Sequence, residues 1–496
     1  MPKRATFMPL AGIELKRSAT DSLHHQLYEQ LRVAILTRRL VAGTRLPSTR
    51  ALAATLAVSR NTVVNAFDQL LAEGYLEGHV GRGTYVARAL PDESLQVHGK
   101  AALFASPRRA HALSRRGSAL ATIEVSTWPD VGTPCAFRTG VPALDLFPMQ
   151  LWTRLAKECW RDLPREHLAY GEPAGYPPLR EAIAAYLGAS RGVRCITDQV
   201  IVVSGSQQAL ELAARLLLDP GDRVWLEDPG YRGARGAIAA AGARLVPVPV
   251  DSEGIQIAAG ISKAAHPKMV YVTPSHQSPL GVTMSLRRRL ALLDWARRTG
   301  VWILEDDFDS EYRYVGRPLP ALQGLDDARR VIYVGTFSKV LFPALRLGYM
   351  VVPMGLMETF TKARALIDRQ PPILEQVVLA RFILQDHFAR HLRRMRVLYA
   401  ERQSALVNAL ERELGDWFEI TSPEAGLQLV AWLPIGVNDR QVSERAAAYK
   451  VEAAPLSAYT LSRLPRGGLA LGYAAFSVPQ IREGVRRLKL ALRSFK

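Results

Sequence analysis

A lysine in the second half of the chain stands where Schiff-base chemistry can occur. The segment GTFSK (335–339) follows the apolar run 331–334, and Arg346 comes seven residues after Lys339. A lysine behind a strand is usually a surface residue. One flanked by two hydroxyls, with an arginine nearby, can instead form a Schiff base beside an anchored phosphate, because a guanidinium binds a phosphate dianion through two hydrogen bonds.

Three further polar segments follow apolar runs in the same region. They are SGSQQ (204–208), DPGY (228–231) and EDDF (305–308). The small residues of the first would present backbone N–H groups and the positive end of a helix to a phosphate, although many α/β turns look the same. Taken singly, Asp306 could equally cap a helix and Tyr231 could equally be a core aromatic. Their joint position behind strands favours a single site.

The elements that would position these segments alternate along the chain from about residue 131. Helical patterns such as 286–298 lie between some of the apolar, strand-like runs, which are 200–203, 224–226, 245–250, 269–273, 301–304 and 331–334. Such alternation predicts an α/β fold with a mostly parallel sheet covered by helices on both faces. Residues just beyond the strands would then meet at one edge of the sheet.

The first 88 residues carry short helical patterns instead. Leu27, Leu31 and Ile35 recur at four-residue spacing and predict one helix, while Ser48 and Ser59 are natural N-caps for a second and a third. A short second helix, a tight turn and a third helix with a polar N-terminal face are typical of a helix-turn-helix, whose third helix enters the major groove of DNA.

The polar face of the third helix carries side chains that can read bases, namely Arg60, Asn61, Thr62 and Asn65. Asparagine can pair with adenine and arginine with guanine. The segment GHVGRG (78–83) then predicts a hairpin with a glycine-rich tip, from which Arg82 can reach phosphate or the minor groove. By periodicity alone, the alternative is a three-helix unit with a solvated polar face.

Composition limits the partners and the compartment. The chain has 496 residues and a net charge of +18, which fits nucleic acid but also an anionic membrane or a merely basic surface. Its three cysteines lie far apart, so we expect neither disulfides nor a metal site. Without a signal peptide or an uncharged apolar run of membrane-spanning length, a cytoplasmic protein is expected. Residues 89–130 lack sustained periodicity and are interpreted as a linker with room for one short helix.

Two parts of the chain resemble known families. Within residues 27–86, PSTRALAATLAVSRNTVVNAFDQLLAEGYLEGHVGRGTYV resembles the winged helix of the GntR family. The segments VIVVSGSQQALELAARLLLDPGD, WLEDPGYRGAR, YVTPSHQSPLGVTMS, ILEDDFDSEYRY and YVGTFSKVLFPALRLGYMVVP resemble fold-type I aminotransferases that depend on pyridoxal 5′-phosphate (PLP). The combination is similar to the MocR/GabR subfamily of bacterial regulators. It implies a winged helix at 1–88 and an aminotransferase-like domain at 131–496, with a large part at about 160–375 and a smaller α+β part at about 376–496.

The resemblance also implies roles for single residues. Lys339 would form a Schiff base with PLP, and Asp306 would pair with the pyridine nitrogen, which makes the ring an electron sink. The other implied cofactor contacts are the phosphate ligands Gly205, Ser206, Gln207, Thr336, Ser338 and Arg346, the ring neighbours Tyr231, His276 and Phe308, and Tyr170 of the second subunit in a head-to-tail homodimer. The implied DNA contacts are Arg50, Ser59, Arg60, Thr62 and wing glycines such as Gly83.

Two positions depart from the subfamily pattern. Phe308 stands where close relatives have a tyrosine whose hydroxyl bonds the cofactor, and Tyr312 is a candidate replacement. Ala458 stands where a member that responds to an amino acid has a carboxylate-binding arginine, and Arg463 is a candidate substitute. Both changes favour an effector other than an amino acid bound in that manner.

Three functions remain open at this point. The chain could be a DNA-binding regulator that senses an amine through PLP, or a regulator that senses PLP itself. It could also be a PLP-dependent aminotransferase with an accessory DNA-binding domain. The nearly complete GntR pattern favours a regulator, and DNA binding without turnover would exclude the third function.

Overall fold

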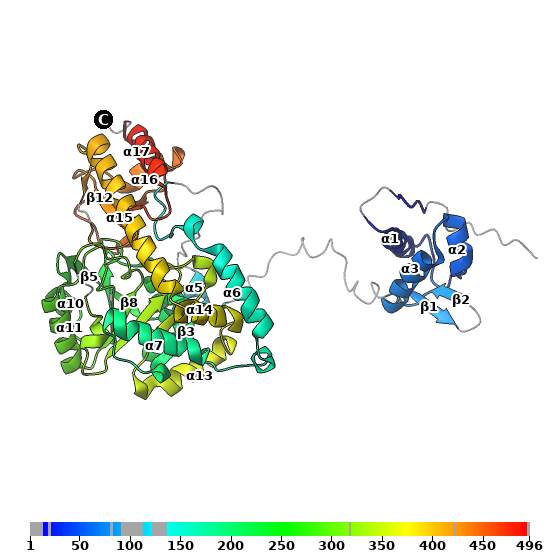
Figure 1. Ribbon diagram of the computed structural model, residues 1–496, viewed down its shortest axis with the longest axis horizontal. Helices are drawn as coiled ribbons and strands as arrows, with labels where there is room; N and C mark the ends of the chain where they lie inside the picture. Colours follow the sequence, from blue (N-terminus) through cyan, green and yellow to red (C-terminus); the bar gives the residue numbers. More distant parts are fainter. Residues whose placement is uncertain are drawn as a thin grey trace, which may run out of the picture. The chain divides into compact units, whose positions relative to one another are not determined.

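The computed structural model describes residues 13–17, 21–79, 83–90, 113–121, 136–316, 319–420 and 423–493. The chain divides into two compact units, residues 1–112 and 113–496, which are described separately (Figure 1). Within the described ranges, no helix is long and apolar enough to cross a membrane.

The first unit is a three-helix domain with a hairpin. Its elements are α1 (Leu23–Leu36), α2 (Thr49–Leu56), α3 (Arg60–Ala72), β1 (Leu76–His79) and β2 (Gly83–Val86). The expected stripe on α1 is confirmed, since Leu27, Leu31 and Ile35 are buried against the apolar face of α3. The two strands pair antiparallel, as a hairpin requires.

Serine caps set the helix-turn-helix geometry. The Ser48 hydroxyl accepts a hydrogen bond of 3.2 Å from Ala51 N at the start of α2. The Ser59 hydroxyl accepts one of 3.1 Å from Thr62 N at the start of α3. Each cap satisfies a backbone N–H that has no partner inside its helix, so both starts are placed by sequence-local chemistry.

The second unit is built on an eight-stranded sheet. Its order is β3-β10-β9-β8-β7-β4-β5-β6, and the pairs β4–β5, β4–β7, β7–β8 and β8–β9 are parallel. The strands are β3 (Val200–Val203), β4 (Arg223–Asp228), β5 (Arg244–Asp251), β6 (Gly254–Ile255), β7 (Met269–Val272), β8 (Trp302–Asp307), β9 (Val331–Thr336) and β10 (Gly348–Val351). This confirms the α/β fold expected from the alternating runs.

Strand β10 was not expected from the sequence. It pairs antiparallel with both β3 and β9. The connection from β9 is short and contains only the turn η5 (Pro343–Leu345), whereas a parallel return needs a crossover of a dozen or more residues. The chain therefore turns back along β9, and the segment between the two strands lies at the carboxyl end of β9.

Helices cover both faces of the large sheet, and their apolar sides form separate clusters with the strands. They are α6 (Met149–Asp162), α7 (Pro177–Arg191), α8 (Ser206–Leu217), α9 (Arg232–Ala240), α10 (Ile257–Lys263), α11 (Leu286–Thr299), α12 (Leu322–Leu325), α13 (Met357–Asp368) and α14 (Ile373–Leu384), while α5 spans Arg115–Ala121. Helix α5 lies inside the expected linker and contacts α9.

A long helix leads to a smaller sheet. Helix α15 (His387–Leu414) runs from the large sheet to α17 (Val478–Leu492), with α16 (Asp439–Ala448) nearby (Figure 1). The antiparallel strands are β11 (Glu419–Ile420), β12 (Gln428–Trp432), β14 (Gly468–Gly472) and β13 (Ala454–Pro455), in that order. Residues 136–137 join this part, because Ala136 and Phe137 accept backbone hydrogen bonds from Glu452 and Gly472.

Candidate functional site

Lys339 lies in the turn that follows β9. Its Nζ donates a hydrogen bond of 2.7 Å to the carbonyl oxygen of Gly140. Burial lowers the pKa of Lys339 below its usual value, and the carboxylates of Asp309 and Asp306 oppose that shift. A lower pKa raises the fraction of neutral amine, which is the form that attacks a carbonyl carbon.

Asp306 lies near the end of β8 and is buried. Its Oδ2 accepts a hydrogen bond of 2.8 Å from the Tyr271 hydroxyl on β7, whereas its Oδ1 has no hydrogen-bond partner among the described residues. Burial raises the pKa of Asp306 to about 7, while the Tyr271 bond and Lys339 oppose the rise. A buried carboxylate oxygen without a donor is costly, so this side chain suits a ligand that brings an N–H group.

The start of α8 faces a guanidinium. Gly205 has φ +102°, and a Cβ added to it would lie 3.4 Å from Nη1 of Arg346. Ser206 is the first residue of α8, where free backbone N–H groups and the helix dipole attract anions. Gly205, Ser206 and Arg346 are thus brought together, as the sequence predicted for a phosphate site.

Two residues with hydroxyl groups, Thr336 and Ser338, lie near Gly205. The register pairs Gly348 with both Val203 and Thr336, which places the ends of β3 and β9 on either side of β10. The hydroxyl of Thr336 accepts a hydrogen bond of 3.2 Å from Ser338 N. Thr336 and Ser338 therefore lie at the same sheet edge as Gly205.

Tyr231 precedes α9 and lies close to Gln207. A Cβ added to Gly233 would meet both the Tyr231 ring and Oε1 of Gln207, and Gln207 Nε2 donates a hydrogen bond of 3.1 Å to the Gly233 carbonyl. Burial, together with the charge of Asp306, raises the pKa of Tyr231 to about 12. The phenol therefore stays protonated beside the carboxylate.

His276 is paired with a residue that sequence reasoning missed. Its Nδ1 lies 3.0 Å from both carboxylate oxygens of Asp309, and both side chains are buried. The His276 ring centre is 5.8 Å from that of Phe308, and its Nε2 has no hydrogen-bond partner in the described part of the chain. Asp309 thus pairs with His276, and its charge also acts on Lys339.

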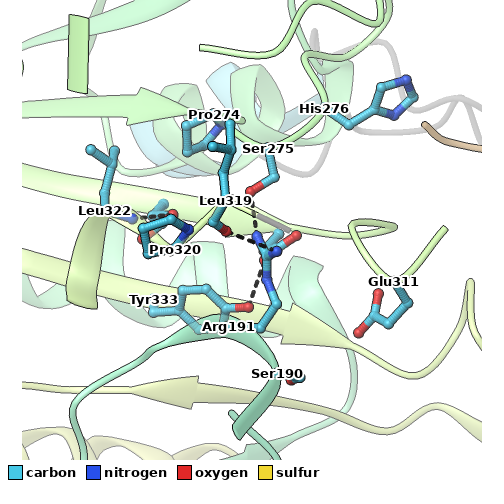
Figure 2. A network of polar contacts seen from close by, with 12 residues as sticks. Ser190, Arg191, Pro274, Ser275, His276, Glu311, Leu319, Pro320, Leu322 and Tyr333 are labelled. Carbon is cyan, nitrogen blue, oxygen red and sulfur yellow. Dashed lines mark hydrogen bonds and ion pairs between the residues drawn. The ribbon is translucent and has the colours of Figure 1, made fainter. Parts of the chain in front are cut away.

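A second buried network lies behind the sheet edge (Figure 2). Asp307 Oδ2 accepts hydrogen bonds from Arg191 Nε at 2.9 Å and from the Tyr333 hydroxyl at 2.7 Å. Arg191 also donates to the Ser275 hydroxyl at 2.5 Å and to the Leu319 carbonyl at 3.2 Å. The network joins α7, β8, β9 and the loop before His276, and so supports the strand that carries Asp306.

Tyr170 is 79% exposed, and its ring lies 4.9 Å from the guanidinium of Arg369. Leu168 and Leu366 are also exposed.

The residues predicted to read DNA are on the surface of the first unit. Arg50, Arg60, Asn61 and Asn65 are exposed, and Thr62 is half-buried because its backbone and hydroxyl bond the Ser59 cap. Gly83 has φ +105°, and a Cβ there would lie 3.1 Å from Nε of Arg45. Arg45 is a basic neighbour of the wing that the sequence did not single out, while Arg82 lies outside the described residues.

Comparison with known proteins identifies the family. Residues 138–488 match aminotransferase class I and II, and residues 23–86 match the bacterial regulatory proteins of the gntR family. The chain is 45% identical over 478 residues to the probable rhizopine catabolism regulatory protein MocR of Rhizobium meliloti, which covers 96% of this chain and 95% of that protein. The chain belongs to the MocR-type regulators.

Other known proteins are similar to nearly the whole chain or to a part of it. The HTH-type transcriptional regulator TauR of Rhodobacter capsulatus is 32% identical, covering 98% of this chain and 100% of that one. The structure of LysN, the α-aminoadipate aminotransferase of Thermus thermophilus complexed with N-(5′-phosphopyridoxyl)-L-leucine, matches with a TM-score of 0.70 and 32% identity, over 76% of this chain and 97% of that one. A MocR-type regulator thus keeps the aminotransferase fold behind its helix-turn-helix.

The two departures now have a structural setting. The Tyr312 hydroxyl, the candidate replacement for the missing hydroxyl of Phe308, donates a hydrogen bond of 3.2 Å to the Val340 carbonyl. Ala458 lies in the turn η7 (Leu456–Tyr459), while Arg463 is exposed in the following loop.

That loop is bound to the end of β4 in the large sheet. The Asp228 carboxylate accepts backbone hydrogen bonds from Leu461 at 2.7 Å and Ser462 at 2.9 Å, and Gly230 N donates to the Tyr459 carbonyl at 2.8 Å. Sequence reasoning missed Asp228 and Tyr459, because their contacts join segments more than 200 residues apart.

Proposed function

We propose that this MocR-type regulator holds PLP on Lys339, binds operator DNA as a homodimer in the cytoplasm, and changes its DNA binding with a small amine effector or with PLP itself. The observation that carries the proposal is the buried Oδ1 of Asp306, which has no donor among the described residues and lies near a lysine of lowered pKa. A protonated pyridine nitrogen would supply the missing donor.

The remaining residues fit the other parts of PLP. Arg346 and the α8 N-terminus at Gly205 and Ser206 would hold the phosphate, with Thr336 and Ser338 at its side. Tyr231 would cover one face of the ring. When bound, PLP supplies a carbonyl carbon for amines and a ring that accepts electrons.

The exposure of Tyr170 supports a dimer. An aromatic ring with 79% of its surface exposed fits a position that a second copy covers, and Tyr170 would then reach toward the partner's cofactor. Two winged helices in one dimer would read paired half-sites on DNA.

Regulation requires that an effector distinguish two states. A ligand can shift a dimer between DNA-binding arrangements only through different affinities for them. Phe308 lacks the hydroxyl that bonds the cofactor in close relatives, and Ala458 lacks the guanidinium that would bind an amino-acid carboxylate. Both changes favour an effector of another kind, PLP included. Comparing the DNA affinity of the protein with and without PLP separates the two regulator hypotheses.

An aminotransferase with an accessory DNA-binding domain is the second candidate. It is favoured by the presence of Lys339 and Asp306 in the arrangement described above, and by the similarity to LysN. The full-length similarity to regulators weighs against it. Turnover of an amino acid with a keto acid would support this candidate over the regulator.

The test of cofactor binding is a visible absorption spectrum with added PLP. We expect a band in the parent and in Lys362→Ala, an exposed lysine on α13, and no band in Lys339→Ala. A parent without a band would refute PLP binding. A band in Lys339→Ala equal to that of the parent would refute the assignment of this lysine.

The test of DNA binding uses duplexes selected from a random pool by the parent protein. Arg60→Ala should weaken binding to the selected duplex by about fivefold or more, the effect of losing one good base contact. Arg445→Ala removes the same charge at an exposed position on α16 and should have little effect on DNA binding. Equal losses in both variants would show that only net charge matters.

A further inference from the structure

The turn that carries Lys339 is fixed by a carbonyl that receives two side-chain donors. The carbonyl oxygen of Val340 accepts a hydrogen bond of 3.2 Å from the Tyr312 hydroxyl and one of 3.0 Å from Nε2 of His391. All three residues are buried. A carbonyl has two lone pairs, so both acceptor positions of this peptide are used.

The two donors come from different parts of the fold. Tyr312 follows β8, the strand of Asp306, and His391 lies in the first turns of α15. Because the donors approach from separate elements, the peptide between Val340 and Leu341 cannot rotate without breaking at least one bond. Other bonds near the lysine are local, such as Leu341 N to the Phe337 carbonyl at 2.8 Å.

The protonation state of His391 is set by this contact. A carbonyl only accepts, so Nε2 must carry the proton, and Nδ1 is then a buried acceptor without a partner among the described residues. Burial lowers the pKa of His391 to about 4, which keeps the ring neutral near neutral pH. The ring packs edge-on against Phe147, with 5.8 Å between centres, so it has little freedom to turn away.

Helix α15 also holds the segment that receives the lysine amine. The Tyr399 hydroxyl, eight residues after His391, accepts a hydrogen bond of 2.9 Å from Ala143 N. Ala143 lies three residues after Gly140, whose carbonyl accepts the Lys339 amine. The Tyr399 ring in turn packs edge-on against Tyr312, with 4.8 Å between centres. One helix therefore supports both the backbone of Lys339 and the acceptor of its amine.

We infer that Tyr312 and His391 are positioning residues for Lys339, acting through the Val340 carbonyl. The inference rests on the proposed attachment of PLP to Lys339. It assigns Tyr312 a role in aiming the lysine, instead of the hydroxyl contact with the cofactor that the sequence suggested. Loss of either donor should let the turn rotate, and so change the geometry and basicity of the linkage between the amine and PLP.

The test is a pH titration of the visible absorption band, combined with PLP affinity. Tyr312→Phe and His391→Leu should each shift the pH midpoint by about 0.3 to 1 pH unit and weaken PLP binding by about two- to tenfold, the effect of one hydrogen bond. His391→Gln keeps a donor and should restore values close to the parent. His387→Leu, on the same helix but away from Val340, is the matched control.

The outcomes separate this inference from the proposed function. A parent protein without a band overturns PLP attachment and this inference with it. A band in the parent, with unchanged midpoint and affinity in folded Tyr312→Phe and His391→Leu, overturns only the positioning role. If His391→Leu fails to fold, as judged by circular dichroism, Tyr312→Phe and His391→Gln decide the question, since a parental midpoint in Tyr312→Phe contradicts the inference.

Discussion

Replacing Arg191 by methionine should strongly destabilise the aminotransferase-like unit. Arg191 and Asp307 are both buried, with 5% and 1% of their side chains exposed, and they are joined at 2.9 Å. The change leaves the Asp307 carboxylate with the Tyr333 hydroxyl as its remaining bond in this network. It also removes the donors of Ser275 and of the Leu319 carbonyl.

The magnitude follows from burying a charge without its partner. Breaking such a pair costs about 3 to 5 kcal/mol, whereas removing both charges is often nearly neutral. Arg191→Met should therefore lower the free energy of unfolding by about 3 kcal/mol or more. Adding Asp307→Asn, which still accepts from Tyr333, should recover at least about half of that loss, because no uncompensated charge remains.

Tryptophan fluorescence in urea measures this unit alone. All eight tryptophans lie beyond residue 112, so the signal does not report on the winged helix. Arg297→Met, which breaks an exposed pair with Asp294, is the control and should be close to the parent. A loss of less than about 1 kcal/mol for Arg191→Met, or a double variant no more stable than the single one, would refute the reasoning.

Three further predictions concern other parts of the chain. The free energy of unfolding should fall by up to about 3 kcal/mol as pH falls from about 6.5 to about 4, because in that window His391 takes up a proton only in the unfolded chain. Urea titrations at several pH values measure this change, and His391→Gln should remove the part that His391 contributes. Gly426→Ala places a Cβ on the His276 ring at φ +97°, so the variant should lose thermal stability and the PLP absorption band, unlike Gly355→Ala, where a Cβ meets open space. Ser59→Ala removes the α3 cap and should cost the winged helix about 0.5 to 2 kcal/mol by circular dichroism, which a parental melting curve would contradict.

Local patterns were enough to predict much of the fold. Apolar runs marked six strands of the large sheet, since strands buried on both faces read as continuous hydrophobic segments. Ser48 and Ser59 marked the starts of α2 and α3, because a cap bonds a backbone group only two or three residues away. The clustering of Gly205, Thr336 and Arg346 also followed, as strand ends in such a sheet share one edge.

Contacts between distant segments were not predictable in this way. His276 and Asp309 are 33 residues apart, and Lys339 and Gly140 are 199 apart. No periodicity connects such pairs, because their approach depends on how the loops pack against the sheet. The same limit applies to Tyr312. Its sequence position suggested a hydroxyl for the cofactor, but its hydroxyl bonds the Val340 carbonyl and its ring packs against Tyr399 of α15.

Strand β8 ends in three consecutive carboxylates, Glu305, Asp306 and Asp307, whose surroundings differ. Successive side chains of a strand point to opposite faces, so Glu305 and Asp307 share one face and Asp306 takes the other. Glu305 accepts backbone hydrogen bonds from Leu322 and Gln323 at the start of α12, and Asp307 binds Arg191. Asp306 and Asp307 each keep one buried oxygen without a donor among the described residues, but of the two only Asp306 acts on Lys339 through its charge. Three consecutive carboxylates therefore differ because the pleat directs Glu305 to α12 and Asp307 to Arg191, and directs Asp306 to the opposite face.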